Sequence, residues 1–145
     1  MLYGPQALEF RILFRPHGVN FGLDNMSDLP YSEQMNPYDK PVDWLGGELK
    51  TPPMSMEARL KAGFFVRMLQ GGEKLSMPES RPMPSIGSRC HELRIQDKDS
   101  TWRVIYRLDA AAILIVDVFQ KKSQQTPKHV IDTCKARLSD YNAGQ

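Results

Sequence analysis

The sequence contains little of the material from which disulfide frameworks and metal sites are built. Its 145 residues include two cysteines, Cys90 and Cys134, and three histidines. The cysteines lie far apart and have no neighbours at metal-ligand spacing, so we expect two buried, reduced thiols. No cluster of carboxylates or histidines has metal-ligand spacing either. We therefore expect no metal and no small-molecule cofactor.

Long apolar runs are also missing. A helix that crosses a bilayer needs about 18 uninterrupted apolar residues, and no stretch of this sequence comes close to that length. The N-terminus lacks a basic region followed by an apolar stretch, so we expect no secretory signal, no membrane partner and a cytoplasmic location. With 41% hydrophobic residues, the chain can bury one ordinary core, which predicts one domain plus extras.

The net charge of +2 is small, but it is unevenly distributed. Residues 1–39 hold two arginines against five acidic residues, which gives −3. Residues 40–145 hold 17 Lys and Arg against 12 Asp and Glu, which gives +5. A moderately basic domain favours a polyanionic partner. Many enzymes nevertheless carry this much charge on a solvated surface.

Residues 1–39 differ in character from the rest of the chain, because prolines and glycines interrupt them. We interpret them as an N-terminal extension that is a disordered or loosely docked tail. The alternative is a start codon assigned too far upstream, with Met26 or Met35 as the true first residue. The domain itself is expected at 40–145.

The first half of that domain predicts a short strand and a helix. Residues 41–45 have the character of a strand, and Ser55 can cap a helix that ends at Gly71-Gly72. The proline-rich stretch 73–88 is expected to be a long loop. Apolar residues at a spacing of four predict the buried helix face, namely Met56, Leu60, Phe64 and Met68, with Leu69 beside them.

The second half predicts a sheet followed by a helix. Strands are expected at 91–96, 102–108 and 112–119, the last of them central because it is nearly all apolar. Thr126 can cap a C-terminal helix with Pro127 at its first position. The helix face expected to pack on the sheet consists of Val130, Cys134, Leu138 and Tyr141, with Ile131 adjacent.

Two arginines are expected to meet on the sheet. If the turn at 97–100 closes a regular hairpin, Arg94 lies opposite Arg103 on one face. Like charges directly opposed destabilise a bare hairpin, whereas a bound anion would relieve the repulsion. The pair thus favours a phosphate-binding role over a structural role, in which the arginines would pair with Glu92 or Asp117.

Three stretches of the sequence carry a resemblance to a known family. They are Lys-Pro-Val-Asp-Trp-Leu-Gly at 40–46 with the helix that follows, Pro-Met-Pro-Ser-Ile-Gly at 82–87 with the strands that follow, and Val-Phe-Gln-Lys-Lys-Ser-Gln-Gln-Thr-Pro-Lys at 118–128. The last string is the most specific. Together they resemble the RelE/ParE superfamily of bacterial toxins, in particular its phage-derived, HigB-like branch, over residues 40–142.

The resemblance implies an α+β, RelE-like fold with an N-terminal helix, a small antiparallel sheet of about three to five strands, and a C-terminal helix packed on the sheet. It also implies a toxin of a type II toxin–antitoxin system that acts as a ribosome-dependent, metal-independent endoribonuclease. Such an enzyme aligns the attack of a 2′-hydroxyl on phosphorus and stabilises the charge that develops.

The implied partners are mRNA on the ribosome and a helix-turn-helix antitoxin. The superfamily also contains ParE-type toxins directed against gyrase and members without demonstrated cleavage. A gyrase-directed toxin and a non-catalytic module that binds only an antitoxin therefore stay open as alternatives.

The superfamily pattern also assigns candidate site residues. Arg103 matches the strand arginine that stabilises the phosphate, and Arg94 matches a basic position on the preceding strand. Lys121 and Lys122 match a basic pair after the last strand, although they would otherwise belong to a solvated loop. The candidates for catalysis are Arg94, Arg103, Lys121, Lys122, Lys128 and His129. The candidates for RNA contact are Arg94, Arg107, Lys121, Lys122 and Lys128.

The sequence departs from the pattern at the proton-transfer position. Lys128 lies near the place where relatives have a C-terminal tyrosine or another proton-transfer residue. Tyr141 is about four helical turns from Pro127 and is expected to pack in the core. His91 and His129 are further candidates, because only histidine titrates near neutral pH without perturbation.

Overall fold

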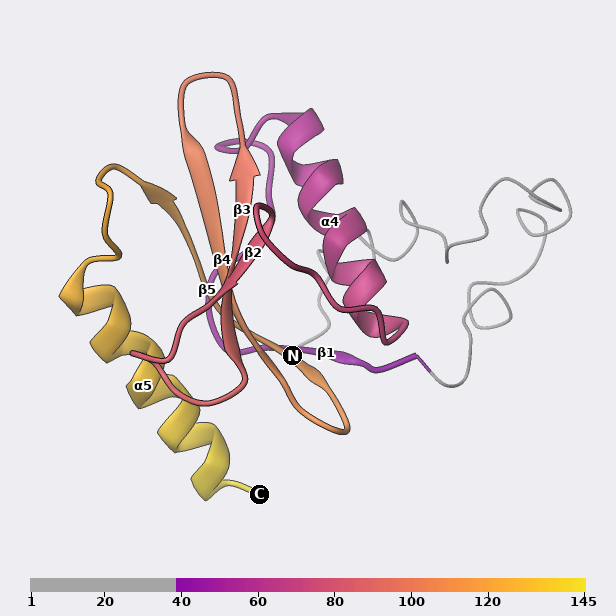
Figure 1. Cartoon of the computed structure of the whole chain (residues 1–145), viewed down its shortest axis with the longest axis vertical. Coiled ribbons are helices and arrows are strands. Elements are labelled where there is room, and N and C mark those ends of the chain that lie inside the picture. The colour runs from indigo at the N-terminus through magenta and orange to yellow at the C-terminus, as the bar shows by residue number, and fades with distance from the viewer. Residues whose placement is uncertain (1–38) are drawn as a thin grey trace, which may run out of the picture.

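The described part of the chain folds as a five-stranded sheet with one helix on each face (Figure 1). The computed structural model describes residues 39–145. Its elements are β1 (Val42–Trp44), α4 (Met56–Gln70), β2 (Ser80–Pro82), β3 (Cys90–Gln96), β4 (Thr101–Leu108), β5 (Ile113–Lys121) and α5 (Lys128–Ala143). The α+β fold class is thereby confirmed. The extension expected at 1–39 lies, apart from Asp39, outside the described residues.

The strands are ordered β1-β5-β4-β3-β2, and every pair is antiparallel except β1 with β5. The pairing of β3 with β4 places Gln96 opposite Thr101, so the expected hairpin register is confirmed. Strand β2, however, lies within 73–88, where we expected only a loop. Three residues are too few to show strand alternation, and Pro82 argues against a strand. Pro82 is tolerated here because β2 is an edge strand.

Helix α4 packs against the sheet through small side chains rather than through the predicted stripe. Met56 and Phe64 are 52% and 47% exposed, so their predicted burial was wrong. The buried apolar residues of the helix are Ala58, Ala62, Val66 and Leu69. Leu69 was part of the predicted face, whereas the other three buried residues are offset from that face by two positions, or about 200° around the helix. Both stripes have nearly the same spacing, and the shorter side chains let the helix lie closer to the sheet.

Helix α5 covers the opposite face through the predicted residues. Val130, Cys134 and Leu138 are buried against side chains of β4 and β5. Cys90 and Cys134 are both buried and free, as expected. The predicted helix cap was wrong, because the N-cap residue is Pro127 and makes no side-chain cap hydrogen bond.

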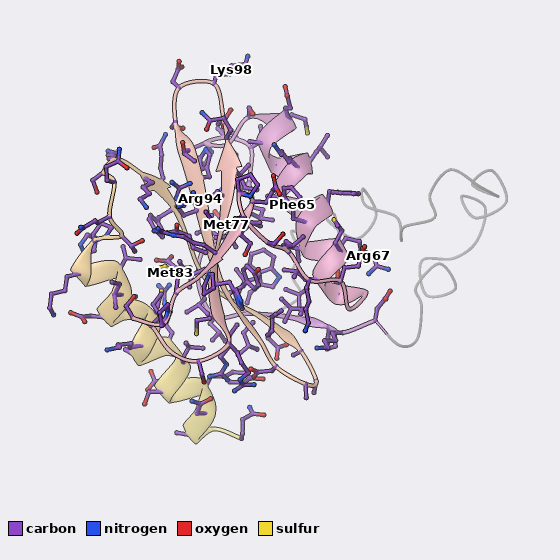
Figure 2. The ribbon with its side chains drawn as sticks, viewed as in Figure 1. Phe65, Arg67, Met77, Met83, Arg94 and Lys98 are labelled. Atoms are coloured by element: carbon purple, nitrogen blue, oxygen red, sulfur yellow. The ribbon has the colours of Figure 1, made fainter. Side chains whose placement is uncertain are left out.

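The two faces of the sheet differ in what they leave uncovered. Figure 2 shows Arg94 on the α5 side of the sheet and Arg67 on α4, on the other side. Lys98 lies at the tip of the hairpin that joins β3 to β4. Helix α5 begins at Lys128 and covers only one half of its face. The other half carries the basic residues predicted for the site.

Candidate nucleic-acid interface

Four basic side chains from four strands meet at one buried carboxylate. Glu92 on β3 is 0% exposed, and its Oε1 lies 3.0 Å from Nε of Arg81. The same oxygen lies 3.4 Å from Nε of Arg103 and 3.8 Å from both Nε of Arg94 and Nζ of Lys121. Side chains alternate along a strand, so Glu92 and Arg94 share one face. We refer to these five residues as the Glu92 cluster.

The pairing of the strands explains why the cluster forms. Arg81 on β2 lies opposite Glu92, and Arg94 on β3 lies opposite Arg103 on β4. Lys121 is the last residue of β5 and pairs with Thr101, two residues before Arg103. One end of a single sheet face therefore collects a cation from each of these four strands.

The Glu92 cluster has more positive charge than it can neutralise internally, with four cations against one carboxylate. Nε of Arg94 and both Nε and Nη1 of Arg103 are buried without a hydrogen-bond partner. Leaving a buried charged donor unpaired is costly. Phosphate oxygens, like carboxylate oxygens, are strong acceptors for guanidinium groups. The cluster therefore has the composition of a binding site for a phosphate.

The cluster borders an open depression of about 460 Å³ on the α5 side of the sheet. The depression is lined by Arg94, Thr101, Arg103, Lys121, Lys122, Ser123 and Gln124. Its volume lies in the range of small-molecule sites, about 300–1,000 Å³, and so can hold a nucleotide unit. Glu92 does not line the depression and lies behind the cations. The predicted candidates Arg94, Arg103, Lys121 and Lys122 are thus brought together.

Burial changes the acidity of two of these cations. The side chain of Lys121 is only 4% exposed, and loss of hydration lowers the pKa of its ammonium group. Glu92 opposes this by raising the pKa, and the three arginines of the cluster lower it further. Desolvation likewise lowers the pKa of Arg103. A lysine with a lowered pKa has a larger neutral fraction at a given pH and can accept a proton.

Three predicted site residues lie away from the depression. Arg107 is four residues beyond Arg103 on β4 and donates from Nε to Oδ1 of Asp109 at 2.7 Å. Lys128 is exposed in the first turn of α5 and donates to Oδ2 of Asp132 at 2.7 Å. His129 is exposed beside it. None of the three lines the depression.

The remaining predicted proton-transfer candidate, His91, also lies elsewhere. His91 stacks on Tyr106 with ring centroids 5.2 Å apart. It precedes Glu92 on β3 and therefore faces the opposite side of the sheet. Tyr141, which we expected to pack in the core, is partly buried against the hydrophobic cluster under α5, and its hydroxyl donates to Oδ2 of Asp43 at 3.1 Å. Within 39–145, no group of three or more histidine, cysteine or acidic residues is placed to hold a metal ion.

Sequence reasoning missed Arg81 and the contact made by Thr126. It named Glu92 only as one of two possible ion-pair partners of Arg94 and Arg103, and that pairing is present in the structure. Arg81 lay in the expected loop, and Thr126 was assigned to the helix cap. In the structure, Oγ1 of Thr126 instead donates to Oε2 of Glu92 at 2.8 Å. One available signal was the charged Glu92 in a strand whose other inward positions include Cys90. A buried acid of this kind needs a cationic partner.

Comparisons with known proteins place the chain in a family. Residues 51–139, more than half of the chain, match the model described as phage derived protein Gp49-like (DUF891). Searches of the curated proteins and of the solved structures found no match. Neither helix of residues 39–145 combines the length and the apolarity needed to cross a bilayer. The matched range contains every residue of the Glu92 cluster, and the chain belongs to the phage-derived Gp49-like family.

Proposed function

We propose that this protein is the toxin of a type II toxin–antitoxin pair and inhibits translation by cutting mRNA on the ribosome. Membership of the Gp49-like family is consistent with a phage-derived toxin. The observation that carries the proposal is the Glu92 cluster, whose unpaired guanidinium donors border an open depression. A phosphodiester placed there would receive the hydrogen bonds that these donors lack.

The proposed reaction is an internal transfer within the RNA. The 2′-oxygen bonds to the neighbouring phosphorus and the bond from phosphorus to the 5′-oxygen breaks, which leaves a 2′,3′-cyclic phosphate and a 5′-hydroxyl. Arg94 and Arg103 donate to the non-bridging oxygens as negative charge builds up on them. The protein's own cations supply this stabilisation, so the proposed step is independent of a metal ion.

Two protons must move in this reaction. The 2′-hydroxyl loses one, and we assign its acceptance to the neutral form of Lys121, whose pKa burial lowers. The departing 5′-oxygen gains one, and we assign its donation to the ammonium group of Lys122 at the rim of the depression. Lys128, His129 and Arg107 have no role in this scheme because they lie outside the depression.

The proposed partners are ribosome-bound mRNA and a helix-turn-helix antitoxin that neutralises the protein. The two partners would compete if the antitoxin covers the depression.

Induced expression in bacteria tests the proposal. The wild type, Arg103→Ala and the control Lys98→Ala are expressed side by side, and the 5′ ends of mRNA are mapped. Lys98 is an exposed lysine on the β3–β4 turn, so its removal deletes one positive charge outside the cluster. We expect growth arrest and cut messages for the wild type and Lys98→Ala, and neither for Arg103→Ala.

The alternatives give different results in the same cells. Arrest with intact message contradicts the proposal, and accompanying DNA damage would indicate a gyrase-directed toxin. Expression that is harmless in all three strains would indicate a module that only binds an antitoxin.

A further inference from the structure

We propose that Glu92 is a positioning residue of the cleavage site, which holds the four cations in place while leaving the donors of Arg94 and Arg103 free for the phosphate. The inference rests on the proposed RNA cleavage and adds a residue that the resemblance did not assign. Glu92 does not touch the substrate in this account. It acts through the cations that surround it.

The burial of Glu92 and its hydrogen bonds exclude direct contact with RNA. The side chain is 0% exposed and does not line the depression. Oε1 accepts from Nε of Arg81 at 3.0 Å, and Oε2 accepts from Oγ1 of Thr126 at 2.8 Å. Both carboxylate oxygens are thus already bonded to side chains that do not line the depression. Glu92 is therefore poorly placed to act as a general base.

The remaining cations are attracted to Glu92 but are not satisfied by it. Arg103 and Arg94 approach Oε1 to 3.4 and 3.8 Å, yet their Nε atoms have no hydrogen-bond partner. The carboxylate therefore keeps the guanidinium groups close together without using up their donors. Without the carboxylate, four mutually repelling cations would spread into solvent. Small displacements of catalytic groups can reduce rates by about 100-fold.

Thr126 connects the carboxylate to the loop that forms one wall of the depression. The loop runs from Lys122 to Thr126 between β5 and α5, and Lys122, Ser123 and Gln124 line the depression. The hydrogen bond from Thr126 to Glu92 fixes the end of this loop against β3. Glu92 therefore also sets the position of Lys122, the assigned proton donor.

The first test is Glu92→Gln, assayed with purified protein on ribosomes programmed with mRNA. Glutamine keeps the shape, can accept from Arg81 and can donate to Thr126, so the variant loses mainly the charge. We expect kcat to fall about 100-fold. We expect KM to stay the same or to decrease, because the cluster gains one net positive charge toward RNA. Glu48→Gln, at an exposed position paired with Lys50, is the matched control and should match the wild type.

A pH profile separates positioning from simple structural support. Lys121 is faced by Glu92 and Arg94 from β3, Arg103 from β4 and Arg81 from β2. Only Glu92 raises the pKa of Lys121 among these groups. In Glu92→Gln, the residual activity should therefore rise at lower pH than in the wild type. A variant that was merely less folded would keep the wild-type pH profile, and an unshifted profile in Glu92→Gln would overturn the inference.

Thr126→Val keeps the test decisive if Glu92→Gln fails to fold. It removes the bond to Oε2 of Glu92 without changing any charge, and we expect kcat to fall about tenfold with unchanged RNA affinity. Wild-type kcat in folded Thr126→Val and Glu92→Gln, with Arg103→Ala inactive, would refute the role of Glu92 and leave the proposed function standing. An inactive wild type would instead refute both.

Discussion

Arg94 and Arg103 lie directly opposite each other on β3 and β4, and the Nε atoms of both lie within 4 Å of the same oxygen of Glu92. A pair of like charges in this arrangement destabilises a sheet unless a counter-charge holds it. Glu92 provides one negative charge, and a phosphate would provide another. The sheet therefore carries an unfavourable arrangement that a bound nucleic acid would relieve.

Replacing Arg103 by methionine should abolish RNA cleavage and stabilise the folded protein. The side chain of Arg103 is 11% exposed and two of its nitrogens are buried without hydrogen bonds. Glu92 keeps its hydrogen bonds to Arg81 and Thr126 in Arg103→Met, so no carboxylate is left alone, while buried donors without a partner are removed. A buried donor without a partner costs about 1 kcal/mol or more. We expect Arg103→Met to raise the free energy of unfolding by about 1 kcal/mol in urea titrations and to abolish cleavage. A destabilised variant would indicate that Arg103 serves the fold.

The rate of cleavage should increase with pH over the range in which Lys121 loses its proton. Burial lowers the pKa of Lys121, so its neutral form gains population as the pH rises and the rate should level off above that pKa. Lys121→Arg cannot lose its proton in this range and should show a low rate without this increase. Lys98→Arg is the control and should keep the wild-type profile. The same increase in Lys121→Arg would show that another group accepts the proton.

The stability of the hairpin tip should decrease in acid because of Asp97. Its carboxylate accepts hydrogen bonds from the backbone of Ser55 and Lys98 and from Nε1 of Trp102. Hydrogen bonds from Ser55 are the largest cause that lowers the pKa of Asp97, from 3.8 to about 2. The folded state thus binds fewer protons than the unfolded state between these values. This stabilisation is complete above about pH 4 and is lost as the pH falls toward 2.

Asp97→Asn tests this linkage. Its Tm should be below that of the wild type at about pH 6, and the difference should shrink at about pH 2.5. Thermal unfolding followed by circular dichroism at both pH values measures the effect. An equal difference at both pH values would mean that the charge of Asp97 contributes nothing.

Gly47 and Gly72 form a matched pair for testing the backbone. Both have positive φ, +79° and +90°, so alanine at either position costs about 1–2 kcal/mol in strain. A Cβ at Gly47 would lie 2.4 Å from the backbone nitrogen of Val118, whereas a Cβ at Gly72 would meet no atom within 4 Å. We expect Gly47→Ala to lower the free energy of unfolding more than Gly72→Ala in denaturant titrations. Equal losses would mean that β5 adjusts freely.

Local sequence patterns were sufficient for the hairpin and for the arginine pair. The turn at 97–100 and the alternation of the flanking strands determine the register, and with it the position of Arg94 opposite Arg103. The apolar face of α5 was predictable for the same reason, because three spaced residues formed one stripe. These features depend on residues close together in the sequence.

Features that depend on distant contacts were not predictable. Glu92 becomes the centre of the cluster only when β2 pairs with β3 and Thr126, in the segment after β5, donates its hydrogen bond to Glu92. Arg107 and Arg103 share one face of β4, but they lie four residues apart, which is about 13 Å along a strand. The sequence alone did not show which end of this face α5 leaves uncovered. Which face of α4 is buried depends on how closely the helix packs on the sheet, and this distance cannot be read from the helix sequence.

The chemistry of the cut ends tests the central claim most directly. Purified protein is incubated with ribosomes that hold a defined mRNA, and the new RNA termini are identified. We predict 5′-hydroxyl and 2′,3′-cyclic phosphate ends with the wild type and uncut mRNA with Arg103→Ala. Uncut mRNA with the wild type, or 5′-phosphate ends, would contradict the account. Either result would mean that the cations around Glu92 do not promote attack of the 2′-oxygen on the neighbouring phosphorus.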